Sequence, residues 1–188
     1  MRTRYQSVVL LLASATAFGA VGCAFPPNRV GFIEKLAREN RKIAHSTRSF
    51  HAAIAPLKKG QPADAGQVRS GYQEMEKTIK EAQAEMDAQP LPASSSSAKP
   101  FLAAYKEYLN AEQKILTDDL QPIVKRVEET GGNPAASAFV DGQLAKVTAD
   151  ENAAYRPLEE AQKNYASEHN YTVQSLQTYI DLQKAGKQ

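Results

Sequence analysis

The histidines are the first residues of this chain to test for metal or acid–base chemistry. They are His45, His51 and His169. Metal-binding helical bundles use Glu-x-x-His pairs on facing helices, but Lys42, Arg48 and Ala166 stand three residues before the three histidines. A zinc site from scattered histidines and unspecified carboxylates stays open, although the spacing does not favour it. We therefore predict no metal and no cofactor.

Three acidic residues, Glu112, Asp119 and Glu151, fall near the apolar stripes of the predicted helices. Paired carboxylates can serve as general acid and base. We favour the simpler interpretation that they lie at stripe edges or pair with lysine and arginine near helix ends. The sequence thus predicts no catalytic residue and no enzyme. A hydrolase or metal enzyme using His169 with nearby acids is the weaker alternative.

The tyrosines are the other notable residue type, because the chain has eight of them and no tryptophan. Six lie on the third and last predicted helices: Tyr105, Tyr108, Tyr155, Tyr165, Tyr171 and Tyr179. Tyrosine often packs its ring in a core while its hydroxyl reaches water. We expect Tyr105 and Tyr165 in the core. Tyr155, Tyr171 and His169 form a possible binding surface.

The elements that position these residues are all predicted to be helices. Alanine, glutamine, glutamate, lysine and leucine are frequent and favour helix, and the alternating β-branched runs typical of strands do not appear. Apolar residues recur at helical spacing over about 29–57, 65–88, 99–130 and 134–184. The predicted fold is an all-α, antiparallel up-down bundle of about four helices, the last long and kinked.

Prolines and glycines mark the connections and the irregular points. Residues 90–100, rich in proline and serine, predict a solvated loop. Gly131-Gly132-Asn133-Pro134 predicts a tight turn between neighbouring helices. The apolar phase continues across Pro122 and Pro157, which favours kinks over breaks. A break near Arg156, giving a fifth helix, is the alternative.

The first 23 residues, MRTRYQSVVLLLASATAFGAVGC, place two arginines before an apolar run that ends in small residues and the only cysteine. This segment resembles the signal peptide and lipobox of bacterial lipoproteins. The resemblance implies cleavage after Gly22, acyl chains (diacylglycerol and a fatty acid such as palmitate) on Cys23, and a periplasm-facing place in the cell envelope. Ala24 favours the outer membrane if the cell is Gram-negative. An ordinary signal peptide or an uncleaved anchor is the alternative.

The expected organisation is a signal peptide at 1–22, a lipidated tether at 23–28 and a bundle domain at 29–188. Removal of 1–22 takes two arginines, so Lys+Arg falls from 23 to 21 against 21 Asp+Glu. This balance lacks the strongly basic character typical of nucleic-acid binding. We predict a non-enzymatic interaction or scaffolding lipoprotein with an envelope protein partner. The alternative is a helical module that binds a small apolar ligand near the tyrosines.

Overall fold

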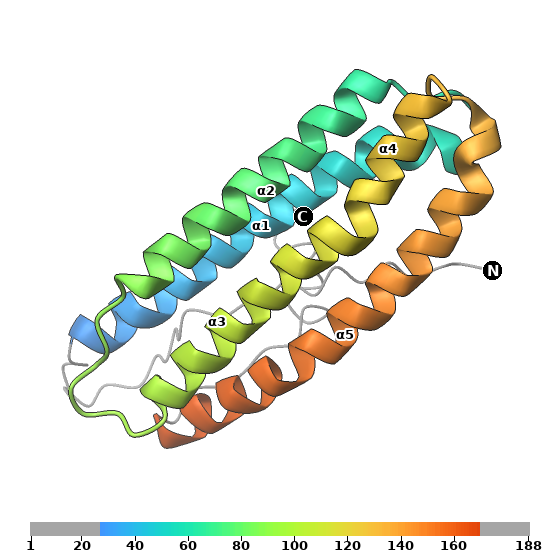
Figure 1. The fold of residues 1–188 in the computed structure, drawn as a ribbon. Coiled ribbons are helices and arrows are strands. Elements are labelled where there is room, and N and C mark those ends of the chain that lie inside the picture. Colours follow the sequence, from blue (N-terminus) through green and yellow to red (C-terminus); the bar gives the residue numbers. More distant parts are fainter. Residues whose placement is uncertain (1–26, 170–188) are drawn as a thin grey trace, which may run out of the picture.

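The computed structural model describes residues 27–169 of the protein, with side chains from Gly31 onward (Figure 1). The described chain is a bundle of helices without a strand, which confirms the predicted all-α class. Its elements are α1 (Pro27–Lys58), α2 (Ala65–Asp87), α3 (Ala98–Ile115), a π-helical turn η1 (Leu116–Leu120), α4 (Gln121–Glu129), a 3-10 turn η2 (Pro134–Ala136) and α5 (Ser137–Glu168). The predicted lipidation, cleavage and tyrosine positions Cys23, Gly22 and Tyr171 lie outside the described residues.

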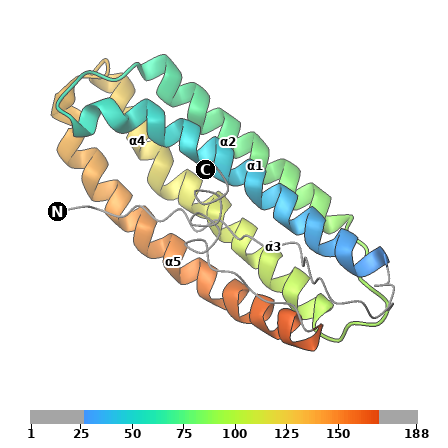
Figure 2. The same ribbon diagram turned by 180° about the vertical axis from the view of Figure 1, so that it is seen from behind.

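Helices α1 and α2 lie side by side along most of their length (Figures 1 and 2). Gly71 explains how closely they approach, because a Cβ atom there would stand 3.0 Å from the Cα of Phe50. The glycine that weakens α2 locally is therefore a packing requirement. Asp64 caps the start of α2 by accepting hydrogen bonds from the backbone N–H groups of Gly66 and Gln67, at 2.8 and 3.1 Å.

The predicted third helix is α3, η1 and α4 in sequence, and Pro122 explains the π-helical turn between them. Proline has no N–H to donate within a helix. Just before it, the N–H of Gln121 bonds to the carbonyl of Leu116, five residues back. This wider turn lets the helix continue past Pro122 instead of breaking. Likewise α5 is continuous from Ser137 to Glu168 with Pro157 inside it, so the described chain has no break near Arg156.

The turn between α4 and α5 holds one end of the bundle together. Gly131 and Gly132 both have positive φ, at 59° and 76°, as the predicted turn requires. Asn133 caps the following turn by accepting from the N–H of Ala135 at 2.9 Å. The carbonyl of Gly132 accepts a 2.9 Å hydrogen bond from the N–H of Ala63 in the loop between α1 and α2. The two loops are thus joined directly.

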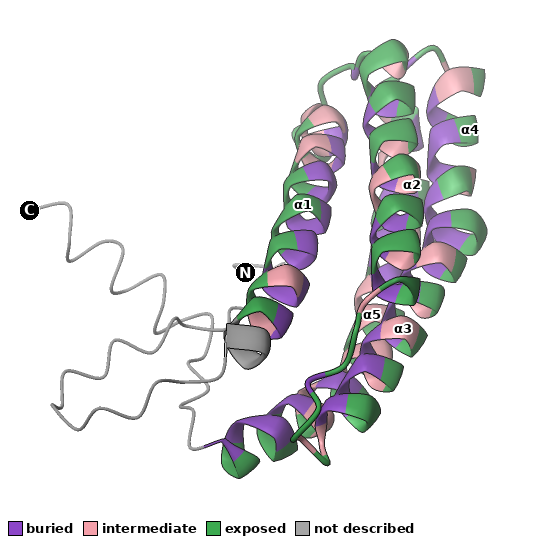
Figure 3. Ribbon diagram, turned by 90° about the vertical axis from the view of Figure 1, so that its left-hand side faces the viewer, coloured by how far each residue is buried: buried purple, intermediate pink, exposed green. Residues whose placement is uncertain are grey.

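Aromatic rings fill the core at the opposite end. Phe32 of α1, Phe101 of α3 and Tyr165 of α5 meet with ring centroids 5.4 to 6.0 Å apart. Figure 3 shows the buried faces of the helices turned toward one another and the exposed faces turned outward. Tyr105 and Tyr165 are both fully buried, which confirms their predicted place in the core.

Candidate functional site

His169 and Tyr155, two members of the predicted binding surface, are placed on or inside the packed face of α5. His169 follows α5 and its side chain is only 3% exposed. Its ring lies against Tyr165, with centroids 4.5 Å apart. Tyr155 is half-buried and meets Tyr108 of α3 edge-on at 6.3 Å. Burial raises the pKa of Tyr155 to about 12. The structure does not bring these two residues together into one surface.

His169 lies close to Ser95 and Glu168, and these three residue types also form the catalytic triad of many hydrolases. Its Nε2 atom lies 2.9 Å from the Oγ of Ser95. In a triad the acid holds the opposite ring nitrogen, Nδ1, so that Nε2 can take the serine proton. Here the nearest oxygen of Glu168 is 3.9 Å from Nε2 itself. Ser95 Oγ also accepts the N–H of Ala98 at 3.1 Å. The contacts describe a helix cap.

Glu168 is the centre of that cap and ties α5 to the start of α3. Its carboxylate accepts the N–H groups of Ser96 and Ser97, at 2.9 and 2.8 Å, and contacts the hydroxyls of three serines. These bonds to Ser97 and Ser96 lower the pKa of Glu168 to about 2. The stretch predicted as a solvated loop at 90–100 is therefore ordered by a residue that lies 71 positions further along.

Glu112 corrects one sequence prediction, because it lies in the core and not at the edge of a stripe. The residue is 6% exposed on α3. Burial raises its pKa to about 7, while a hydrogen bond with Tyr108 acts in the opposite direction. Burial and the charge of Glu112 together raise the pKa of Glu151, on α5, to about 8. We call Tyr108, Glu112, Glu151 and Tyr155 the buried acidic strip.

Asp119 pairs with a lysine, as predicted for these acids, but it is buried and does not lie at the edge of a stripe. It is 2% exposed in the π-helical turn and pairs with Lys146 of α5. The charge and hydrogen bond of Asp119 raise the pKa of Lys146. This ion pair links α5 to the irregular turn beside Pro122. Its role is therefore structural.

The outward side of α1 is a strongly basic surface. Helix α1 carries seven lysines and arginines against two glutamates, a net charge of +5. By contrast α5 carries three against six, a net charge of −3. The exposed residues of α1 include four cations and a histidine, which we call the basic face: Arg38, Arg41, Lys42, His45 and Arg48. The net charge of the whole chain hides this surface, because acidic residues elsewhere balance its cations.

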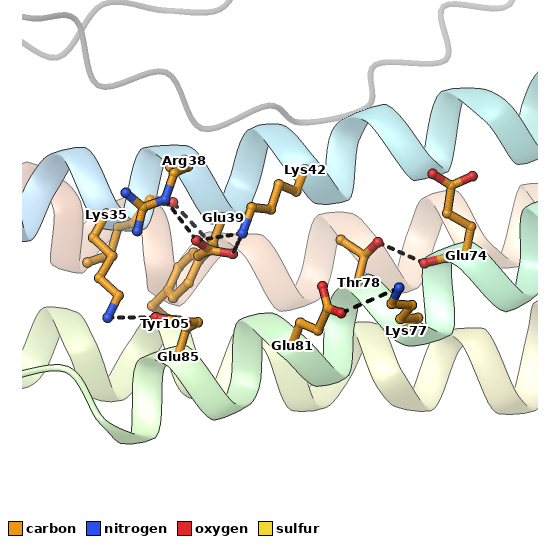
Figure 4. Close-up of polar contacts among 11 residues, drawn as sticks. Lys35, Arg38, Glu39, Lys42, Glu74, Lys77, Thr78, Glu81, Glu85 and Tyr105 are labelled. Carbon is orange, nitrogen blue, oxygen red and sulfur yellow. Dashed lines mark hydrogen bonds and ion pairs between the residues drawn. The ribbon is translucent and has the colours of Figure 1, made fainter.

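Glu39 is the acid of α1 that pairs with cations of the basic face. Its side chain is 1% exposed and accepts from Arg38 at 3.2 Å and from Lys42 at 2.8 Å. Figure 4 shows both cations reaching over this single carboxylate, with Tyr105 beneath it. Arg41 and Arg48 have no ion-pair partner within residues 31–169. The basic face therefore keeps an excess of positive charge after its own pairing is counted.

A shallow groove of about 420 Å³ runs between the basic face and α2. Its lining residues are Arg38, Arg41, Lys42, His45, Glu74 and Thr78. Five of these carry or can carry charge and none is apolar. Such a groove suits contact with a charged partner and not the capture of an apolar molecule. Glu74 is its only acidic side chain.

Two kinds of feature are absent from the described part of the chain. None of its helices combines the length and apolar character needed to cross a membrane. No group of three or more histidine, cysteine, aspartate or glutamate side chains gathers there as a metal site. Comparisons with protein-family models, with curated proteins and with solved structures find no match. The fold and the surface charge are therefore the basis for a functional proposal.

Proposed function

We propose that this protein is a lipid-anchored lipoprotein of the bacterial cell envelope that acts as a non-enzymatic interaction bundle. The observation that supports an interaction role is the basic face, where Arg38 and Lys42 pair with the buried Glu39 while the exposed Arg41 and Arg48 have no ion-pair partner within residues 31–169. Surface cations without partners add nothing to the packing of the bundle. They are available to bind something outside it.

The proposed anchor comes from the sequence of residues 1–23. A basic start, an apolar run and a small-residue cleavage site ending at Cys23 define the attachment. Two or more acyl chains hold a protein firmly at a membrane, since each buried methylene contributes about 0.8 kcal/mol. The anchor sets the location, periplasm-facing and outer-membrane if the cell is Gram-negative. The bundle then presents its faces to neighbouring molecules.

The polar clusters of the bundle interior also fit a role without catalysis. The Ser95, His169 and Glu168 contacts form a cap, and Asp119 is neutralised by Lys146. Tyr108 packs against the rings of Tyr105 and Tyr155. These rings occupy the space between the helices that a small apolar ligand would need. Binding of a small apolar ligand stays a prediction from the sequence without a structural observation to favour it.

Two measurements on the full chain in cells test the two parts of this proposal. Radiolabelled palmitate is expected to label the wild type and not Cys23→Ala; equal labelling of both would contradict the anchor. For the interaction, a photo-crosslinking amino acid replaces Arg48 on α1, Lys125 on α4 or Glu160 on α5. A discrete crosslinked species from one face and not from the others is expected. Equal, diffuse crosslinking from all three would contradict a specific contact.

A further inference from the structure

We propose that the basic face of α1 lies against the phosphate groups of the membrane that carries the lipid anchor. This inference rests on the anchoring in the proposed function and adds the orientation of the bundle and the chemistry of its contact. The expected occupant is an anionic phospholipid surface. The contact consists of arginine and lysine side chains on lipid phosphates.

The shape of the basic face fits an extended planar partner. Arg38, Arg41, His45 and Arg48 follow one another at spacings of three and four, so they lie along one side of α1. Arg38 and Arg48 are ten residues apart, which is about 15 Å along the axis. A row of this length meets several headgroups at once, whereas a single small anion would meet one or two of these side chains.

The anchor directly precedes α1, so it brings the start of this helix next to the membrane. Three residues lie between Cys23 and Pro27, the first residue of α1, and the four steps from Cys23 to Pro27 span about 14 Å at most when fully extended. If α1 stood upright, Arg41 would lie about 20 Å further from the surface than Pro27. Charge–charge attraction is screened over about 10 Å at ordinary salt. The cations therefore act on the membrane only when α1 lies along it.

The distribution of charge over the bundle favours the same orientation. With α1 on the membrane, the acidic helix α5 is not the element pressed against lipid phosphates. Contact through α5 instead would bring a net charge of −3 to an anionic surface in place of the +5 of α1. Each lysine or arginine near an anionic membrane contributes roughly 1 kcal/mol. The four cations of the basic face together give an attraction that is measurable without the lipid, and the attachment by lipid strengthens it by raising the local concentration of α1.

A vesicle-binding experiment tests the inference without the lipid. The mature chain, residues 23–188, is made with Cys23→Ser, and its binding to vesicles with phosphatidylglycerol is compared with binding to vesicles of phosphatidylcholine alone. We expect binding only to the anionic vesicles and its loss at about 0.5 M salt, where screening is nearly complete. Equal binding to both vesicle types would overturn the inference, as would no binding to either.

A pair of double variants then assigns the binding to α1. Arg41→Gln with Arg48→Gln removes two cations of the basic face. The matched control, Lys99→Gln with Lys114→Gln, removes two exposed cations of α3 that also lack an ion-pair partner within residues 31–169. We expect the α1 variant to bind about thirtyfold more weakly and the control to change by less than about twofold. Equal losses in both would mean that net charge, and not the face, controls binding.

The outcomes separate this inference from the proposed function. If vesicle binding fails while Arg48 crosslinks to an envelope protein in cells, the face binds an acidic protein. The membrane orientation is then wrong and the interaction role stands. If palmitate labelling fails, the anchor and the argument from its length are lost together.

Discussion

The outer face of α1 and the buried acidic strip between α3 and α5 both hold charged residues, in opposite circumstances. Arg41 and Arg48 are exposed and contribute no described ion pair to the bundle. Glu112 and Glu151 lie between the helices. Burial raises the pKa of Glu112 to about 7, and burial together with the charge of Glu112 raises the pKa of Glu151 to about 8. Charge on the face is available to partners. Charge in the strip affects the stability of the bundle and its dependence on pH.

Removal of a core ring is the largest effect that this comparison predicts. Tyr165 is fully buried against Phe32 and Phe101. We expect Tyr165→Ala to lower the free energy of unfolding by about 3–5 kcal/mol, as for other buried aromatic residues. Urea unfolding followed by circular dichroism measures it. If Tyr165→Ala lowered the free energy of unfolding no more than Arg48→Ala does, Tyr165 would not be part of the core.

The buried strip predicts that the bundle becomes less stable as pH rises from about 5 to 8. The ordinary pKa of glutamate is near 4.5, so the unfolded chain loses this proton first while folded Glu112 keeps it until about pH 7. Folding is therefore favoured at acid pH and loses free energy as the pH rises through the folded pKa. Glu151 acts in the same direction up to about pH 8.

The variant Glu112→Gln isolates this contribution. Glutamine keeps the shape and a polar partner for Tyr108 but cannot ionise. We expect a gain on the order of 2 kcal/mol over the wild type at pH 8.5 and little difference at pH 5. Glu107→Gln, at an exposed position of the same helix, is the control and should change neither. Chemical denaturation at the two pH values gives the comparison; a gain that is equal at both would reject the buried charge.

The helix cap predicts a smaller effect with the opposite pH dependence. Glu168 has a lowered pKa, so its contribution is complete above about pH 4.5 and is lost as pH falls toward 2. We expect Glu168→Gln to lower the melting temperature slightly at pH 7, with the difference shrinking under acid conditions. Glu160→Gln, exposed on the same helix, should leave the melting temperature unchanged. A loss of stability that persists at pH 2 would show that charge is not what matters there.

The basic face predicts the smallest effect on folding. Arg41→Gln with Arg48→Gln should change the free energy of unfolding by no more than about 0.5 kcal/mol, as expected of exposed residues without structural partners. The same urea series measures it beside Tyr165→Ala. A large loss would mean that these arginines stabilise the bundle, and the contrast between face and strip would be wrong.

Much of the fold could be predicted because helical periodicity is a local signal. The spacing of apolar residues located the helices, and the core positions of Tyr105 and Tyr165 followed from it. The turn residues Gly131, Gly132 and Asn133 were equally informative, since positive φ and capping depend on residue type. Pro122 and Pro157 were correctly predicted not to break their helices.

Some features were not predicted because they depend on contacts between segments distant in the sequence. Another was not predicted because net charge was summed over the whole chain and not over single helices. Glu112 occupies a core position, where it is buried and forms a hydrogen bond with Tyr108. Its burial depends on the facing helix, which the local sequence does not reveal. Glu168 reaches serines more than 70 positions away, which no local pattern reveals. The basic face could have been predicted from the sequence, because seven of the chain's lysines and arginines fall within residues 27–58. Summation over the whole chain concealed it, since acids elsewhere balance them.

Lysine labelling of the lipidated protein in anionic vesicles tests the orientation most directly. Lys42 belongs to the basic face, whereas Lys114 and Lys125 are exposed on α3 and α4. Acetylation rates measured by mass spectrometry, with and without vesicles, report which side chains the membrane covers. If α1 lies on the membrane, Lys42 is protected on vesicles while Lys114 and Lys125 react as in free protein. Equal reactivity at all three, or protection of Lys114 or Lys125 instead of Lys42, would contradict it.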